Sequence, residues 1–160
     1  MLKYTDVYVA TMARGLSQPG EQVVVAAAGE YQSFWTFKIP FFKYAYLLIA
    51  TTDRLLVLQH RKGLVFDRLD RVDSYPWSQI SLLKISGLGT KKLVVKDGQG
   101  RAVLKMKVAG SFLGPMKNSG TSARMIVQTW EQRRQLGPAA AHGALPQRTM
   151  GSTGPATQFT

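Results

Sequence analysis

The feature that most constrains the fold of this chain is a succession of short apolar segments followed by a single helical pattern. Turn residues separate these segments, which cover residues 23–25, 44–49, 55–58, 80–83, 93–95 and 103–106. Several short strands bounded by turns are typical of an antiparallel sandwich or barrel. Residues 122–135 then carry the helical pattern, and a terminal helix can close the open end of such a barrel.

The terminal helical pattern has a single apolar face, because its apolar residues recur at positions i, i+3, i+4 and i+7. These residues are Ala123, Ile126, Val127 and Trp130. Arg133 and Arg134 in the last turn complement the helix dipole, and Gly137 followed by Pro138 ends the pattern.

Residues 4–16 form a second, shorter helical pattern with Tyr4, Tyr8 and Met12 on one face. Thr5 or Asp6 can cap its start, and Gly15 can end it. The strands that we expect cover residues 23–31, 44–51, 54–59, 78–86, 91–96 and 101–108, with room for one more short strand within 64–74. Tight turns at 52–53 and 97–100 join two pairs of these strands as hairpins.

The expected fold class is therefore α+β but mainly β. It is an antiparallel barrel or sandwich of six to seven strands, capped by a C-terminal amphipathic helix and preceded by a short N-terminal helix. A chain of 160 residues forms one such domain with extensions. Residues 1–19 are the N-terminal helix and linker, residues 20–137 the domain, and residues 138–160 a flexible tail rich in Ala, Gly, Pro and Thr.

The composition excludes several classes of protein. The chain has no cysteine, which rules out a disulfide scaffold, a thiol nucleophile and a cysteine-ligated zinc site. Its net charge of +12 favours an anionic partner, namely nucleic acid, a membrane surface or an acidic protein. Solvated lysine and arginine side chains without a specific partner are the alternative explanation of this charge.

The sequence indicates neither a membrane span nor an export signal. The apolar stretch 34–50 contains Lys38, Pro40 and Lys43, whereas a spanning helix needs about 20 predominantly apolar residues. The first residues begin no apolar run with a cleavage site. We therefore expect a cytoplasmic protein, with peripheral attachment to a membrane as an alternative.

Three sequence motifs resemble bacterial pleckstrin-homology (PH)-like domains. They are Gly20-Glu21-Gln22-Val23, the hairpin Ile49-Ala50-Thr51-Thr52-Asp53-Arg54-Leu55-Leu56-Val57, and the strand entry Tyr75-Pro76-Trp77-Ser78-Gln79-Ile80. The resemblance covers about residues 20–136, and its most specific motif is the Thr-Asp-Arg hairpin. It implies a PH-like barrel and a binding role rather than catalysis.

The residues that carry enzymatic chemistry are scarce. His60 lies in a basic turn and His142 in the tail, with no carboxylate at a useful spacing from either. Asp67, Asp70 and Asp73 alternate with arginines, which is typical of local ion pairs rather than of a cation loop. Gly87-Leu88-Gly89 lacks the third glycine and the strand-to-helix transition of a phosphate-binding loop. We therefore expect no enzyme, no cofactor, no metal site and no small-molecule substrate.

Basic residues gather on one face of the last two expected strands. Alternation places Leu93 and Val95 inward on the first strand, and Ala102, Leu104 and Met106 inward on the second. Five cations then point outward: Lys92, Lys96, Arg101, Lys105 and Lys107. This pattern fits an anion-binding face, and it fits equally a soluble sheet face that lysine protects from aggregation.

A second candidate surface is the aromatic segment 34–43. In PH domains the corresponding loop is the usual headgroup-binding region, and Lys38 and Lys43 match the basic residues at its base. We expect partner or membrane contact from six residues. They are Trp35, Phe37, Lys38, Phe41, Phe42 and Lys43. The aromatic side chains can instead belong to the core, because large aromatic residues are normally buried.

Three functions remain open from the sequence. The first is a non-enzymatic PH-like module that binds a protein partner or forms a homo-oligomer, since exposed aromatic patches mark partner sites. The second is peripheral binding to an anionic membrane through the 34–43 segment. The third is nucleic-acid binding through the basic sheet face, which ranks last because its strands do not alternate aromatic residues with cations.

Overall fold

The computed structural model describes residues 4–31, 44–61, 68–87, 91–108, 116 and 118–136. It contains the helices α1 (Asp6–Leu16) and α2 (Ser119–Leu136) and the short 3-10 helix η2 (Trp77–Gln79). The strands are β1 (Val23–Tyr31), β2 (Tyr44–Thr51), β3 (Arg54–Arg61), β4 (Arg68–Pro76), β5 (Ile80–Ser86), β6 (Lys91–Asp97) and β7 (Ala102–Val108). All of them belong to one antiparallel sheet in the order β4-β3-β2-β1-β7-β6-β5.

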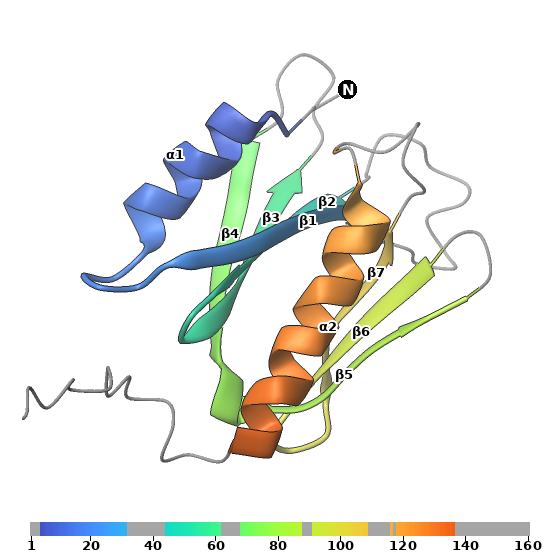
Figure 1. The fold of residues 1–160 in the computed structure, drawn as a ribbon. Coiled ribbons are helices and arrows are strands. Elements are labelled where there is room, and N and C mark those ends of the chain that lie inside the picture. The colour runs from blue at the N-terminus through green and yellow to red at the C-terminus, as the bar shows by residue number, and fades with distance from the viewer. Residues whose placement is uncertain are drawn as a thin grey trace, which may run out of the picture.

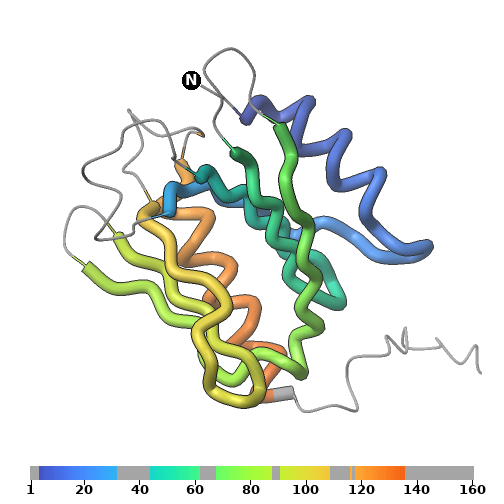
Figure 2. The backbone as a smooth tube through the Cα atoms, turned by 180° about the vertical axis from the view of Figure 1, so that it is seen from behind, coloured from blue at the N-terminus to red at the C-terminus, as the bar shows by residue number. Residues whose placement is uncertain are grey.

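The sheet bends sharply where β1 meets β7, and Figures 1 and 2 show the two arms that result. The first arm consists of β1, β2, β3 and β4, and the second of β5, β6 and β7. Among the described residues, two pairs join β1 and β7, Glu30 with Lys107 and Tyr31 with Met106. The backbones approach so closely that a Cβ atom on Gly29 would lie 2.5 Å from the carbonyl oxygen of Lys107. A glycine is therefore required at the bend. The two edge strands, β4 and β5, meet at η2 and lie apart at their other ends (Figure 1).

The main hydrophobic core lies between the two arms of the sheet and α2. The helix contributes its predicted apolar face, and all four residues are buried: Ala123, Ile126, Val127 and Trp130. The indole Nε1 of Trp130 donates a hydrogen bond of 3.2 Å to the carbonyl oxygen of Ile80, at the start of β5. The helix thereby closes the barrel, as the sequence predicted.

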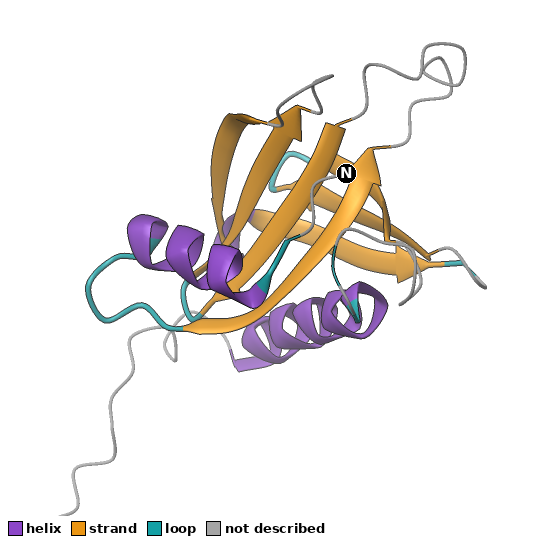
Figure 3. Ribbon diagram, turned by 90° about the horizontal axis from the view of Figure 1, so that it is seen from above, coloured by secondary structure: helices purple, strands orange, loops and turns teal. Residues whose placement is uncertain are grey.

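A second core lies on the opposite side of β1, β2 and β3, where α1 packs (Figure 3). Small side chains such as Ala26, Ala28 and Ala45 let this helix approach the sheet closely. The hydroxyl groups of Tyr4 and Tyr8 hydrogen-bond to the two ring nitrogens of the buried His60, at 2.9 Å and 2.7 Å. The histidine therefore anchors α1 and belongs to the fold.

The structure confirms the predicted fold class, and β1 and β2 have the predicted bounds. Other bounds were wrong by a few residues. Helix α1 begins at Asp6, because the Thr5 side chain caps it by accepting a hydrogen bond from the Tyr8 amide. Strand β3 continues to Arg61, and the uncertain strand in 64–74 is the nine-residue β4, which ends at Pro76. Strand β5 begins at Ile80 rather than at residue 78, because η2 comes first.

The start of α2 also differs from its prediction. The helix begins at Ser119 because that buried side chain forms hydrogen bonds outside the helix. Its hydroxyl donates to the carbonyl oxygen of Met116 at 3.0 Å and accepts from the amide of Ala28 at 3.3 Å. A periodicity of apolar residues does not detect such a tertiary contact. The predicted stop at Gly137 and Pro138, and the tail 138–160, lie outside the described residues.

Candidate binding surfaces

The three motifs that resemble PH-like domains meet at one corner of the first arm. Glu21, from the first motif, accepts two hydrogen bonds of 2.9 Å from the guanidinium of Arg54 and a third from the hydroxyl of Thr51. The amide of Gln18 donates a fourth, of 2.7 Å. Burial acts to raise the pKa of Glu21, but these hydrogen bonds outweigh it and lower that pKa to about 2.

The third motif joins the same corner through Trp77. Its indole Nε1 donates to the carbonyl oxygen of Thr51 at 3.1 Å, and its amide donates to the carbonyl oxygen of Asp53 at 3.3 Å. Arg54 also reaches the hydroxyl of Ser74 on β4, at 3.1 Å. These contacts fix the β2–β3 turn to β1 and β4, so the motif residues have a structural role at this corner.

The predicted basic face exists on the outside of the second arm. Leu93, Val95, Leu104 and Met106 are buried, as predicted. Five lysines on β5, β6 and β7 lie on the side away from the core, and we call them the lysine face: Lys84, Lys92, Lys96, Lys105 and Lys107. Lys84, Lys92 and Lys105 are exposed, and Lys96 and Lys107 are half-buried. Four of these five residues were predicted. Lys84 was missed, although its position between Leu83 and Ile85 in a strand signals an outward side chain.

The start of β7 differs from its prediction in two details. Arg101 lies in the turn before β7 and forms an ion pair of 2.9 Å with Asp97, so its charge is already paired. Ala102 is exposed rather than buried. Val95 pairs with Leu104 and the next residue, Lys96, pairs with Ala102. Val103 is therefore an extra residue on β7 without a partner on β6, which makes it a β-bulge. Such a bulge reverses the alternation of side chains, and it cannot be read from alternation alone.

The lysine face carries an excess of positive charge. Lys92 lies directly opposite Lys107 across β6 and β7, and Val94 lies between Lys84 and Lys105. Like charges at directly opposed positions destabilise a sheet. None of the five lysines forms an ion pair with another described residue. Glu30, the partner of Lys107 on β1, marks the border of this face.

A second surface, which the sequence did not predict, lies on the core-facing side of the first arm, where β1 ends and β2 begins. We call it the tyrosine–arginine face, and it comprises Tyr31, Tyr44, Tyr46, Arg61, Arg68 and Arg71. The register places Tyr44, Arg61 and Arg68 in one row across β2, β3 and β4. Tyr46, Gln59 and Arg71 form the next row, and the rings of Tyr31 and Tyr46 are 6.2 Å apart.

The tyrosine–arginine face is partly open to solvent. Tyr31 is 42% exposed, and Arg61, Arg68 and Arg71 are also exposed. Burial, assisted by the neighbouring Tyr31, raises the pKa of Tyr46 to about 12, so this phenol is neutral at physiological pH. Arg71 forms an ion pair of 2.7 Å with Asp73. The face therefore combines neutral aromatic rings with guanidinium groups.

Sequence reasoning missed this face because its residues come from four strands. The sequence shows that Tyr44 and Tyr46 lie on one face of their strand. That the arginines lie on the same face follows only from the pairing of β2 with β3 and of β3 with β4. A shift in that register between Gln59 and His60 brings Arg68 opposite Arg61. The same pairing shows that Asp70 and Asp73 lie on a strand rather than in a loop, while Asp67 lies outside the described residues.

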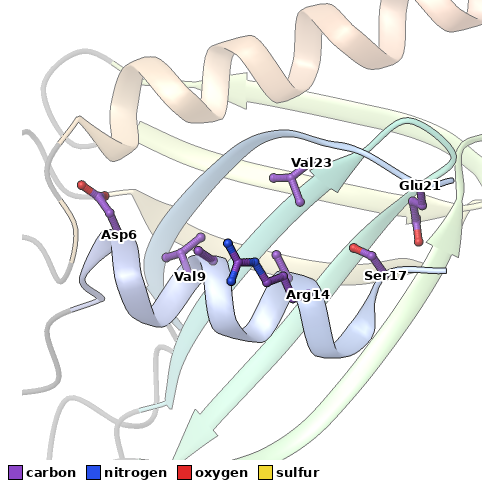
Figure 4. Close-up of a pocket in the computed structure, with 8 residues that line it drawn as sticks. Asp6, Val9, Arg14, Ser17, Glu21 and Val23 are labelled. Carbon is purple, nitrogen blue, oxygen red and sulfur yellow. The ribbon is translucent and has the colours of Figure 1, made fainter. Parts of the chain in front are cut away.

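A shallow cleft of about 380 Å³ lies between α1 and the start of β1 (Figure 4). Val9 and Val23 form part of its apolar wall, and Arg14 lies along it. The carboxylate of Glu21 borders the cleft but is bound to Arg54. The buried hydroxyl of Ser17 has no hydrogen-bond partner among the described residues. Asp6 and Arg14 also line the cleft, and we assign no chemistry to it.

The predicted contact residues of the 34–43 segment lie outside the described residues. They are Trp35, Phe37, Lys38, Phe41, Phe42 and Lys43. Within the ranges that the structure describes, no group of three or more His, Asp or Glu side chains is placed to hold a metal ion. Among the same residues, no helix is long and apolar enough to cross a membrane.

Comparison with known proteins supports the fold. No family model and no curated protein matches the chain. Among solved structures, the hSac2 domain from the human phosphoinositide phosphatase Sac2 is similar, with a TM-score of 0.51 and 9% sequence identity. The match covers 84% of this chain and 86% of that domain. At this identity the likeness concerns the fold alone, which is a mainly β architecture.

Proposed function

We propose that this chain is a non-catalytic, PH-like binding module that docks on an anionic membrane surface through its lysine face. The observation that carries this proposal is the direct opposition of Lys92 and Lys107 among five lysines that lack ion pairs with described residues. Such an arrangement costs stability in the free protein. A negatively charged surface placed against it removes that cost.

The chemistry of lysine favours a lipid surface over a protein interface. Lysine is depleted in protein interfaces, whose centres rely on aromatic residues and arginine. A lipid surface instead presents many mobile charged headgroups, and each basic residue near it contributes about 1 kcal/mol. The resemblance of three motifs to bacterial PH-like domains, and the absence of paired catalytic groups from the sequence, support a binding role.

Vesicle sedimentation tests this proposal. The protein should sediment with vesicles that contain phosphatidylserine, and added salt should weaken the binding. The double variant K92Q/K107Q should lose most of it. The control R14Q/R101Q removes the same charge from exposed positions outside the lysine face and should retain binding. Equal binding to neutral vesicles, or equal losses in both variants, would overturn the proposal.

Self-association, or addition of a strand from a protein partner, is a second candidate, and the edge strand β5 favours it. The other edge strand, β4, is protected by four charged residues: Arg68, Asp70, Arg71 and Asp73. Strand β5 has only Lys84. An edge strand with few charges is a template for pairing with another chain.

Light scattering tests this second candidate, because it measures the oligomeric state of the protein. The variant L82K adds a charge to β5 and should shift an oligomer to monomer, whereas the control L69K on β4 should not. A protein that is monomeric at every concentration excludes self-association. Substitution of Trp35 and Phe37 in the same assay tests the contribution that we proposed for the 34–43 segment.

A further inference from the structure

We infer that the tyrosine–arginine face binds a single strand of nucleic acid, at a site separate from the lysine face. The strands of the lysine face do not alternate aromatic residues with cations, and this was the reason to rank nucleic acid last. The inner side of the first arm instead brings the two kinds of residue into register across strands, with tyrosines on β2 and arginines on β3 and β4. There, Tyr44 lies directly opposite Arg61. Tyr46 lies opposite Gln59, which in turn lies opposite Arg71.

The aromatic component of this site suits unpaired bases. Proteins that bind single strands stack successive bases on aromatic side chains, and they tolerate many sequences because every base has a π-face. Tyr31 is 42% exposed, and its ring packs against that of Tyr46 at 6.2 Å with a tilt of 60°. Tyr46 is 9% exposed and its phenol remains neutral, so its ring supports the more exposed ring of Tyr31. Tyr31 is therefore the residue on which a base stacks, and Tyr44 continues the surface along β2.

The arginines supply the groups that contact phosphate. Arg68 lies directly opposite Arg61 on the neighbouring strand, and both residues are exposed. Arg71, whose side chain is 66% exposed, lies in the next row beside Tyr46 and Gln59. Guanidinium groups bind phosphate oxygens in pairs and also stack on bases. A carboxylate, Asp73, already holds Arg71, so Arg68 is the stronger candidate for phosphate contact.

The position of the face favours a single strand over a duplex. The face lies on the core-facing side of the bent sheet, in the arm that ends at the edge strand β4 (Figures 1 and 2). Stacking on Tyr31 requires a base whose ring face is free, as in a single strand, whereas the lysine face offers only charges, which any polyanion can contact. The two faces thus make different predictions for single-stranded and double-stranded ligands.

Fluorescence anisotropy with the full chain tests the inference. The probe is a labelled thymidine oligonucleotide of about 12 nucleotides, within the range that single-strand binders cover. The comparison ligand is a duplex of equal length, at ~150 mM salt. We expect the single strand to bind more tightly than the duplex. Unlabelled thymidine monophosphate serves as a competitor, and competition at equal nucleotide concentration would assign the site to free nucleotides rather than to a strand.

Variants locate the site. Y31A should weaken single-strand binding about 5-fold or more, since stacking on one aromatic ring typically contributes about 1–3 kcal/mol. Y31F retains the ring and should retain binding, which separates stacking from a folding defect. R68Q should weaken binding and reduce its salt dependence. K92Q/K107Q is the matched control on the lysine face, and it should leave single-strand binding within about two-fold.

Besides competition by thymidine monophosphate, four results would overturn the inference. They are no binding of the single strand at micromolar protein, equal affinity for duplex and single strand, a larger loss in K92Q/K107Q than in Y31A, and an equal loss in Y31F and Y31A. The third of these results would assign any nucleic-acid binding to the lysine face. Vesicle binding through the lysine face is measured separately, so the two proposals can fail independently.

Discussion

Glu21 and Arg54 form an ion pair in which a guanidinium Nε lies 2.9 Å from a carboxylate oxygen, and the side chain of Glu21 is completely buried. The pair joins the residues before β1 to the start of β3. Arg54 extends the connection further, because its Nη2 donates to the carbonyl oxygen of Leu16 at the end of α1. One arginine therefore fixes three segments that are distant in the sequence.

Replacement of Arg54 by Met should destabilise the domain by about 3–5 kcal/mol, because it leaves the buried Glu21 carboxylate without its counter-charge. Chemical denaturation measures the loss. R101Q is the control, since it breaks an exposed ion pair of the same kind, with Asp97, and should cost at most about 1 kcal/mol. The double variant E21Q/R54M should recover part of the lost stability. If R54M and R101Q lose the same stability, this corner has no central role in the fold.

The same pair predicts how stability depends on pH. Folding lowers the pKa of Glu21 from 4.5 to about 2, so the folded state favours the ionised carboxylate. The resulting stabilisation is fully present above pH 4.5 and is lost as the pH falls toward 2. Urea denaturation between these values should show a steeper loss of stability in the unmodified protein than in E21Q. Parallel curves would show that Glu21 does not carry this dependence.

Much of the fold could be predicted because it depends on local patterns. Val23–Tyr31 and Tyr44–Thr51 have bounds set by turn residues and by apolar content, and both were predicted correctly. The helix face that ends in Trp130 follows from a period of 3.6 residues, and it packs as expected. Errors arose where tertiary contacts set the bounds, as at Ser119, whose hydroxyl binds β1.

The candidate surfaces were less predictable because they depend on strand register. Alternation within β6 was enough to place Lys92 outward, but the bulge at Val103 reversed the position of Ala102. The tyrosine–arginine face needs the pairing of β2 with β3 and of β3 with β4, including the shift beside His60. A pattern within one strand contains no information on these pairings.

Gly29 provides a test of the bend between the two arms. G29A should destabilise the fold by about 1–3 kcal/mol or more, because the new Cβ would lie 2.5 Å from a backbone oxygen of β7 that cannot move freely. Thermal denaturation measures the change. The control G15A concerns a glycine in α1 with open space around it, and it should stabilise the protein by about 0.5–1 kcal/mol. Similar losses in both variants would contradict the close approach of β1 and β7.

The hydrogen bonds from Tyr4 and Tyr8 to His60 predict that α1 is held to the sheet by specific contacts as well as by apolar packing. A neutral imidazole donates through one nitrogen and accepts through the other, so two hydroxyl groups satisfy it fully. Y8F removes one of these groups and should cost about 1 kcal/mol. Amide hydrogen exchange should then accelerate in α1 more than in α2, because α1 is the helix that loses a contact with the sheet. The control V7A changes a side chain that is 76% exposed on the same helix and should leave exchange unaltered. If Y8F leaves the exchange of α1 unchanged as well, apolar packing alone holds the helix to the sheet.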